Sequence, residues 1–407
     1  MTPQPRLSEP QPPPPPQPPP PPPARRPPPG RRARRGVALG LAAVALGLAA
    51  CSSGPAGSGA PGPASPVLSP AALAAGAGHA CIVGGGPAPV VDWSSLRNPV
   101  LSYATSGVKD QALVWSSGLW HMIFSQVTED PAAPGGVHWD VATATSPDLA
   151  RWSAASPWPA QAGVYGVASP DVVRDPEGRF VVTYQSDPGG TGPAGTQARL
   201  FYRTSSDLVR WSAPHPLAPS LAPSPRDRMI DGALVFTGHQ LLLGFKYSSP
   251  TQPDVFEMAR STTGALSGPW QLVGRPDIQV VGGTIENYEF VTVGGRWRLV
   301  ATSNNLDQPW IFTLAGDPAN PSGWLRWTGG YEMDIPSQAF NTGPGLSSIG
   351  YEHANSAFLC DAGSLPGHFA YLLYAGSDEL TRFGGWGHAE IGIARSTDQR
   401  TWQVPTG

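Results

Sequence analysis

The sequence predicts an all-β fold, a five-bladed β-propeller that spans residues 80–407. Short runs rich in Val, Leu, Tyr and Trp alternate with clusters of Gly, Pro, Asp and Ser, which is typical of many short antiparallel strands. One phrase also recurs: the end of a strand, Ser or Thr, a turn and a Trp. Its copies end at Trp152, Trp211, Trp270, Trp324 and Trp402. Five copies at intervals of roughly 50 to 80 residues favour five blades of four strands, with an insertion in the last blade.

The recurring phrase also fits a sialidase-type propeller loosely. Ser396, Asp398 and Trp402 lie where the Asp box of that class has its Ser, Asp and Trp. The spacing from Asp to Trp is one residue short, however, and the usual Gly between them is missing. A turn that docks its Trp between two blades explains the phrase equally well, so we rank the sialidase interpretation low.

Three segments precede the predicted propeller. Residues 1–36 are rich in Pro and Arg, and a polyproline run is extended and has nothing with which to pack a core. Residues 37–51 are predicted to be an export signal, because a short apolar run follows the Arg cluster and ends in small residues. The run is shorter than the roughly 20 residues that span a bilayer. Residues 52–79 are mostly Ala, Gly, Pro and Ser, which is typical of a flexible linker.

The end of the predicted signal, Leu48-Ala49-Ala50-Cys51, resembles the lipobox of bacterial lipoproteins. We therefore expect an exported protein that is extracellular or held at the cell surface by a lipid anchor on Cys51, its one expected link to a membrane. Ordinary cleavage nearby, with an incidental Cys, is the alternative.

The amino-acid composition indicates which classes of ligand the protein could bind. A net charge of −3 gives no support for nucleic acid as a ligand. The 14 Trp and 10 Tyr residues suit a protein that stacks rings on sugars, although the same rings also fill β cores. Cys81 and Cys360 could form a disulfide in an oxidising compartment, and two unpaired thiols are the alternative.

A second repeated element lies upstream of the Trp phrases, at the innermost strand of each blade. It has a polar residue, four or five mostly apolar residues, a Gly-containing turn and an apolar strand. Aligned in this way, Asp110, Asp231 and Glu286 occupy the same position in blades one, three and four. Inner strands run beside the propeller axis, so the three carboxyl groups are expected to meet in one pocket. The alternative is that each caps a turn at the start of its strand.

Three carboxyl groups in one pocket point to catalysis. Clustered carboxylates repel one another and raise one another's pKa, which costs stability. Hydrolysis of a glycosidic bond uses such a set: one protonated acid for the leaving oxygen, one ionised base for water, and a neighbour that keeps their pKa values apart.

The sequence segments that contain these carboxyl groups resemble those of glycoside hydrolase family 62, the α-L-arabinofuranosidases. That family shares a clan and the five-bladed propeller with family 43. The resemblance runs from about Trp93 to the end of the chain. It begins with Trp93-Ser94-Ser95 and Lys109-Asp110, continues with FYRTSSDLVRWSAPHPL in blade two and Ile230-Asp231 in blade three, and includes Glu286 in blade four.

The resemblance implies a role for each carboxyl group. Asp110 would be the general base that activates water, Glu286 the general acid, and Asp231 the group that orients the acid and raises its pKa. The clan inverts the anomeric centre, so base and acid are expected ~6.5–9.5 Å apart. Glu289 competes with Glu286 for the role of acid, but strand alternation turns it to the opposite face.

Sugar-binding and metal-binding residues are predicted from their place near the blade openings. Lys109 is expected to bind a sugar hydroxyl, and the other candidates for the rim are Trp120, Tyr165, Trp386 and His388. The acid and base do the chemistry, so no cofactor is required. The resemblance allows a structural calcium beneath the pocket, with His353 as the candidate ligand, although its neighbours differ from those of the family. A hydrogen-bonded core His is the alternative.

The leading functional hypothesis is therefore an inverting exo-glycoside hydrolase, a monomer, that removes α-L-arabinofuranosyl side chains from arabinoxylan or arabinan of plant cell walls. Another activity of the same clan is the first alternative: a β-xylosidase, an arabinanase or a fructan hydrolase. The second alternative is a surface lipoprotein that binds glycans without cutting them. Such a protein would have no need for all three carboxyl groups.

Overall fold

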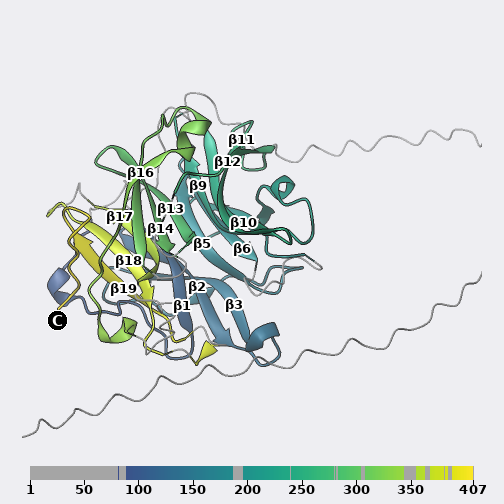
Figure 1. Ribbon diagram of the computed structural model, residues 1–407. Helices are drawn as coiled ribbons and strands as arrows, with labels where there is room; N and C mark the ends of the chain where they lie inside the picture. Colours follow the sequence, from purple (N-terminus) through teal and green to yellow (C-terminus); the bar gives the residue numbers. More distant parts are fainter. Residues whose placement is uncertain are drawn as a thin grey trace, which may run out of the picture. The chain divides into compact units, whose positions relative to one another are not determined.

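The structure is a computed structural model that describes residues 81, 89–186, 196–238, 240–278, 280, 283–303, 308–342, 354–362, 367–379, 381–383 and 387–406. The fold is all-β, with five separate antiparallel sheets (Figure 1). Residues 1–36, 37–51 and 52–79 lie outside the described residues, so the export signal, the lipid anchor and the linker stay predictions. In the part of the chain that is described, no helix is long and apolar enough to cross a membrane.

Each sheet is one blade, with its strands in the order of the sequence from the innermost strand outward. Blade one contains β1 (Gly107–Ser116), β2 (Leu119–Glu129), β3 (Val137–Ser146) and β4 (Ser156–Pro157). Blade two contains β5 (Val167–Arg174), β6 (Phe180–Ser186), β7 (Leu200–Ser205) and β8 (His215–Pro216). Blade three contains β9 (Arg228–Phe236), β10 (Leu241–Ser249), β11 (Gln252–Ser261) and β12 (Trp270–Gly274). Blade four contains β13 (Ile285–Val293), β14 (Arg296–Ser303), β15 (Pro309–Leu314) and β16 (Trp327–Glu332). Blade five contains β17 (Asn355–Asp361), β18 (Ala370–Gly376) and β19 (Glu390–Ser396).

Short 3-10 helices occupy connections before, between and within the blades. They are η1 (Trp93–Ser95), η2 (Pro134–Gly136), η3 (Pro219–Leu221), η4 (Pro321–Leu325) and η5 (Ala339–Asn341).

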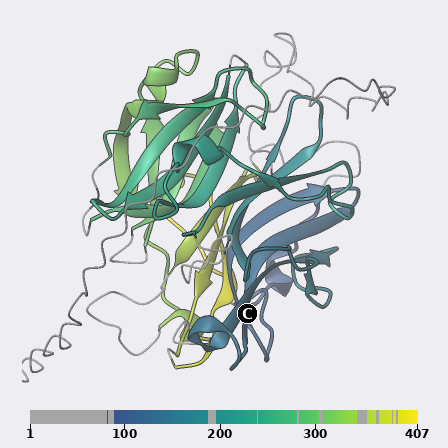
Figure 2. The same cartoon turned by 90° about the vertical axis from the view of Figure 1, so that its right-hand side faces the viewer.

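The innermost strands form a closed ring. β1 contacts β5, β5 contacts β9, β9 contacts β13, β13 contacts β17, and β17 contacts β1. Figure 2 shows the yellow strands of blade five between the blue strands of blade one and the green strands of blade four. Apolar side chains of neighbouring sheets pack against each other between the blades, and the largest cluster joins blades one, two and five. The predicted five-bladed propeller is thus confirmed.

Both ends of the described chain close the last blade. The sheet of blade five has three strands, where the repeat predicts four. Its outer edge is completed by two isolated bridges to β19, in which Leu101 pairs with Ile391 and Gln403 pairs with Arg395. The edge strand that would otherwise expose unpaired backbone groups is therefore covered from both sides of the sequence.

A disulfide ties the start of the described chain to blade five. Cys81 is bonded to Cys360 of β17, with a Cα–Cα distance of 5.3 Å. The backbone of Cys81 also accepts a hydrogen bond from Trp115 N of β1. The expected pairing of the two cysteines is confirmed, and it joins residues 279 positions apart in the sequence.

The recurring Trp phrase forms a turn at the end of a third strand. In blade one, Ser146 Oγ accepts the backbone N–H groups of Asp148 and Leu149, and Asp148 Oδ1 accepts those of Ala150 and Arg151. The same bonds recur from Ser205 and Asp207 in blade two and from Ser396 and Asp398 in blade five. A Ser and an Asp that satisfy turn N–H groups explain the repeat structurally.

Every innermost strand carries a β-bulge at the same height on the axis. The strand register shifts at this point in all five blades. One residue of each bulge has a left-handed backbone, and these residues are Asp110 (φ 52°), Ser169 (φ 51°), Asp231 (φ 53°), Asn287 (φ 50°) and Ser356 (φ 52°). We refer to them as the bulge ring. A non-glycine residue at positive φ is strained, and such strain clusters at functional sites.

The bulge ring corrects the alignment made from the sequence. Asp110 and Asp231 are equivalent, as predicted, but their equivalent in blade four is Asn287. Glu286 lies one residue earlier and is equivalent to Lys109 of blade one, because Glu286 pairs with Thr302 as Lys109 pairs with Ser125. The alignment is off by one because apolar pattern and strand length do not reveal which residue adopts the bulge.

Candidate active site

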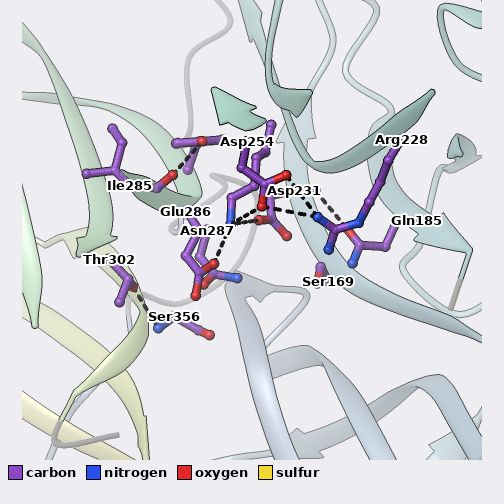
Figure 3. Close-up of polar contacts among 12 residues, drawn as sticks. Ser169, Gln185, Arg228, Asp231, Asp254, Ile285, Glu286, Asn287, Thr302 and Ser356 are labelled. Atoms are coloured by element: carbon purple, nitrogen blue, oxygen red, sulfur yellow. Dashed lines mark hydrogen bonds and ion pairs between the residues drawn. The ribbon is translucent and has the colours of Figure 1, made fainter. Parts of the chain in front are cut away.

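The three predicted carboxyl groups lie in one pocket on the propeller axis. Asp110 of β1, Asp231 of β9 and Glu286 of β13 line a cavity of about 90 Å³. The cavity is completed by Lys109, Trp139, Ser169, Gln185, Arg228, Ile230 and Asn287. Figure 3 shows Asp231, Glu286, Asn287 and Ser356 converging from blades three, four and five. Residues of β9, β13 and β17 thus meet those of β1, although up to 246 positions separate them in the sequence.

Asp110 is the centre of a hydrogen-bond network that joins four blades. Its Oδ2 accepts hydrogen bonds from Ser125 Oγ (2.8 Å) and Ser169 Oγ (3.2 Å). Its Oδ1 lies 3.1 Å from the donor Asn287 Nδ2 and 2.6 Å from Ser356 Oγ. Hydrogen bonds to an ionised acceptor are short and strong, so this network fixes the carboxylate in one orientation.

In blades one, two and four the second strand supports the bulge of the next blade. Three backbone N–H groups of the bulge ring donate to a side-chain oxygen there: Ser169 N to Ser125 Oγ (2.7 Å), Asp231 N to Gln185 Oε1 (2.6 Å) and Ser356 N to Thr302 Oγ1 (2.9 Å). Ser125, Gln185 and Thr302 occupy equivalent positions, each opposite the residue that precedes the bulge.

Lys246 occupies that position in blade three, opposite Ile230. An ammonium group has no lone pair with which to accept an N–H, so Lys246 cannot act as Ser125 or Thr302 do. Its Nζ instead donates to Glu286 Oε2 at 2.5 Å and lies 3.9 Å from Asp231 Oδ2. Only 4% of its side chain is exposed. Sequence reasoning missed this residue. An alignment of the second strands would have shown a Lys where three other blades have a small or neutral polar side chain.

The electrostatics of the pocket raise the pKa of Asp231. Burial is the main cause, and Lys246 opposes it by attraction. Repulsion by Glu286 and Asp110 adds to the effect of burial, and the pKa of Asp231 is raised from 3.8 to about 6. A carboxyl group that titrates near neutrality in a cleft is typical of a catalytic site.

The raised pKa predicts how stability depends on pH. Native Asp231 keeps its proton up to about pH 6, whereas the unfolded chain loses it near 3.8. The native state therefore binds more protons in this window, and the stability that Asp231 contributes is present at low pH and is lost as the pH rises through about 6. We expect Asp231→Asn to gain stability relative to the wild type, by up to about 3 kcal/mol, between about pH 4 and about pH 7. Urea unfolding at both pH values measures the difference. An unchanged difference would contradict the assignment.

The predicted sugar-binding residues divide into two groups. Lys109 lines the pocket, with Nζ 4.0 Å from Asp110 Oδ1, and its contact with a sugar stays a prediction. The prediction that Trp120 lies at the rim is wrong. Its side chain is fully buried in β2 and packs against Trp115 at the turn end of the β1–β2 hairpin, away from the pocket. Among the described residues, Trp139 of β3 is the aromatic residue that lines the pocket. Trp139 gave no separate signal in the sequence, because it lies in a third strand and not at a blade opening.

Two other rim candidates do not line this pocket. Tyr165 is exposed and stands edge-on to His138 just before β5. His388 is half-buried, and its Nε2 lies 2.9 Å from the backbone oxygen of Tyr103. Their contact with a sugar stays a prediction. Trp386 lies outside the described residues.

The metal prediction stays untested. His353 lies outside the described residues. Within the described ranges, no three His, Cys, Asp or Glu side chains gather so as to hold a metal ion. A cavity of about 30 Å³ does lie along the axis, where Asp171 and Glu289 join all five members of the bulge ring in its wall. Glu289 Oε2 accepts the backbone N–H of Leu359 at 2.6 Å, which ties Glu289 to blade five and away from Glu286.

Comparison with known proteins supports the fold. No protein-family profile matches the chain, and no curated protein sequence is similar to it. Among solved structures, the chain is similar to one from the GH130 family of mannoside phosphorylases, which contains glycoside hydrolases that target β-1,2 mannosidic linkages in Candida mannan (13% identity, 76% of this chain and 94% of that chain, TM-score 0.52). It is also similar to a glycosyl hydrolase from Bacteroides ovatus (13% identity, 76% and 93%, TM-score 0.51). A GH62 hydrolase in complex with xylotriose has 14% identity, with 74% and 95% covered and a TM-score of 0.49.

The predicted likeness to glycoside hydrolases is thus confirmed at the level of the fold. At 13% identity the likeness shows the fold alone. The reaction and the sugar have to be argued from the site.

Proposed function

We propose that this protein is an exported, inverting glycoside hydrolase that removes α-L-arabinofuranosyl side chains from arabinoxylan or arabinan. One observation carries the proposal: Asp110, Asp231 and Glu286, from three blades, line one axial pocket. Most glycoside hydrolases cleave their substrate with such a pair of carboxyl groups, one as acid and the other as base or nucleophile. The preference for arabinose rests on the family resemblance of the sequence.

The exposure of the carboxyl groups favours Glu286 as the acid. Its side chain is 21% exposed, against 5% for Asp110 and 5% for Asp231. In an exo-acting enzyme the sugar fills the pocket and the leaving group points to solvent. The proton donor therefore has to stand at the mouth, where Glu286 stands, and the base has to stand deeper.

Asp110 is suited to the role of base. Its carboxylate is held on the axis by donors from blades one, two, four and five, so it presents a fixed acceptor to a water molecule. In the proposed reaction, Asp110 takes a proton from this water as the water attacks the anomeric carbon. The electron pair of the broken bond goes to the glycosidic oxygen, which receives the proton of Glu286.

Asp231 is a neighbour of the acid and not its partner in displacement. Lys246 Nζ lies 2.5 Å from Glu286 Oε2 and 3.9 Å from Asp231 Oδ2. Asp231 and Glu286 therefore lie beside one another on either side of the same ammonium group. This supports Asp231 as the group that orients Glu286 and tunes its charge.

The disulfide supports export. Bonds such as that between Cys81 and Cys360 form and persist in oxidising compartments and are rare in the cytosol. A plant cell-wall polysaccharide is a polymer that an enzyme must meet outside the cell. We therefore place the reaction outside the cytoplasmic membrane, with the chain secreted or anchored at Cys51.

A substrate screen tests the proposal. The purified chain is incubated with arabinoxylan, arabinan and aryl glycosides of α-L-arabinofuranose, β-D-xylose, β-D-mannose and β-D-fructofuranose, and the released sugars are identified by chromatography. We expect arabinose, and proton NMR of the first product is expected to show the inverted anomer. Release of another sugar would overturn the arabinofuranosidase assignment alone. A retained anomer would overturn the inverting mechanism, and no release from any substrate would overturn the hydrolase.

A further inference from the structure

The role of Lys246 follows from its place in the repeat. In blades one, two and four the equivalent residues, Ser125, Gln185 and Thr302, support the bulge of the following blade by accepting a backbone N–H. Blade three gives up this support at the border with blade four, which carries Glu286. A stabilising contact of the scaffold is thus replaced by a buried cation that faces a proposed catalytic group.

A buried ammonium group is costly unless carboxylates surround it. Burial by itself disfavours the charge on Lys246, yet Glu286 and Asp231 outweigh burial and raise the pKa of Lys246 above 10.5. Lys246 is therefore a permanent positive charge between two carboxyl groups of the pocket. It lies nearest to Glu286 and within 3.9 Å of Asp231.

Other charges also face this group. The charged and titratable residues around Glu286 and Lys246 are Arg228 and Asp231 of β9, Asp254 of β11, Tyr288 of β13, and Lys109 and Asp110 of β1. Asp254 accepts a hydrogen bond from Arg228 at 3.2 Å and also lies 3.9 Å from Lys246. Lys246 is thus the cation in direct hydrogen-bond contact with Glu286 among the described pairs.

We propose that Lys246 is a positioning residue of the reaction, which stabilises the carboxylate left on Glu286 when its proton passes to the glycosidic oxygen and which pairs with Asp231 while Glu286 is protonated. The proposal rests on the proposed glycosidase function. Before the transfer the proton is on Glu286 and Asp231 is ionised; after it both carboxyl groups are ionised, with Lys246 beside both. The cycle closes when Asp110 releases to solvent the proton that it took from water and Glu286 takes a proton from solvent. Lys246 therefore acts through Glu286 and makes it a stronger acid.

Lys246→Met tests this with a readout that a merely structural role would not move. Removing the cation makes Glu286 harder to ionise, so the basic limb of the pH profile of kcat/KM is expected to move to higher pH. We expect kcat to fall about 10²-fold for an oligosaccharide, whose leaving group needs a proton, and less than about 10-fold for a nitrophenyl glycoside, with KM little changed. Lys246→Arg keeps the charge and is expected to restore most of kcat and the position of the limb.

Two further variants keep the test decisive. Lys246→Gln is a polar neutral substitution for use if the Met variant is poorly folded, and the same shift of the limb is expected. Arg275→Met is the matched control, since Arg275 forms an ion pair with Glu257 at 3.2 Å in blade three outside the pocket. This control variant should change neither kcat nor the pH at which the basic limb of the kcat/KM profile falls. Equal losses on both substrates, or an unmoved limb, would overturn the proposal.

A direct titration separates this proposal from the proposed function. Carbon-13 NMR of the chain labelled at the Glu carboxyl carbons follows Glu286, whose signal is assigned by its loss in Glu286→Gln. The titration midpoint of Glu286 is expected to be higher in Lys246→Met than in the wild type. If the wild type cleaves none of the glycosides, the function is wrong, and the midpoint alone still decides whether Lys246 controls the charge of Glu286: an unchanged midpoint refutes it.

Discussion

Glu286→Gln is expected to lower kcat/KM for an oligosaccharide about 10³-fold, because the amide has no proton to give to the glycosidic oxygen. The loss should depend on the leaving group. A nitrophenolate leaves without a proton, so the same variant should keep activity on a nitrophenyl glycoside within about 10-fold of the wild type. Initial rates on the two substrates at one pH measure the contrast.

Glu289→Gln is the matched control for this prediction. Glu289 lies on the same strand, is buried, and accepts the backbone N–H of Leu359, a bond that the amide oxygen of Gln can still accept. We expect it to leave the ratio of the two rates unchanged. If Glu289→Gln showed the leaving-group dependence and Glu286→Gln did not, the acid would be Glu289 and our assignment would be wrong.

Asp110→Asn is expected to cost activity and stability together. An amide cannot take a proton from water, so kcat/KM should fall by about 10³-fold or more on both substrates, without the dependence on the leaving group that marks loss of the acid. The amide also places an N–H₂ among side chains that now donate to Asp110, namely those of Ser125, Ser169, Asn287 and Ser356. The free energy of unfolding should therefore fall by about 1–3 kcal/mol.

Kinetics and urea unfolding of Asp110→Asn separate its two roles. Asp171→Asn is the control, because Asp171 is a buried carboxyl group two residues beyond the bulge of blade two, in the wall of the axial cavity. We expect it to affect stability without a comparable loss of kcat. If Asp110→Asn destabilised the chain but kept its turnover, Asp110 would be a structural centre of the bulge ring and not the base.

The variants at Asp110, Glu286 and Lys246 together test one reaction scheme. Loss of the base lowers the rate for every leaving group, whereas loss of the acid or of its cation lowers it chiefly for poor ones. Because Lys246 contacts both Glu286 and Asp231, the effects of substitutions at these three positions should not add. A substitution at Lys246 is expected to cost little further activity once Glu286 has become Gln.

The sequence was sufficient for the fold because each blade is a local unit. Short apolar runs and turn residues specify strands and hairpins, and a repeat that ends in the same Trp phrase counts the blades. The same local logic located Asp110 and Asp231 at equivalent positions of their blades. The pairing of Cys81 with Cys360 was one of two options, and it followed from the expected oxidising compartment. The repeat predicted a fourth strand in blade five, where the edge is instead completed by Leu101 and Gln403.

What only the tertiary structure decided involves contacts between blades. Which residue of an inner strand takes a left-handed backbone depends on its pairing with the second strand and on the side chain beneath it, so Asn287, and not Glu286, completes the bulge ring. Burial depends on packing between sheets, which removes Trp120 from the rim and brings Trp139 to the pocket. The ion pair of Lys246 with Glu286 joins residues 40 positions apart on different blades, and no periodic pattern along one strand records such a contact. Sequence periodicity thus determined the strands and the number of blades, and the closing of the ring determined which charges meet on its axis.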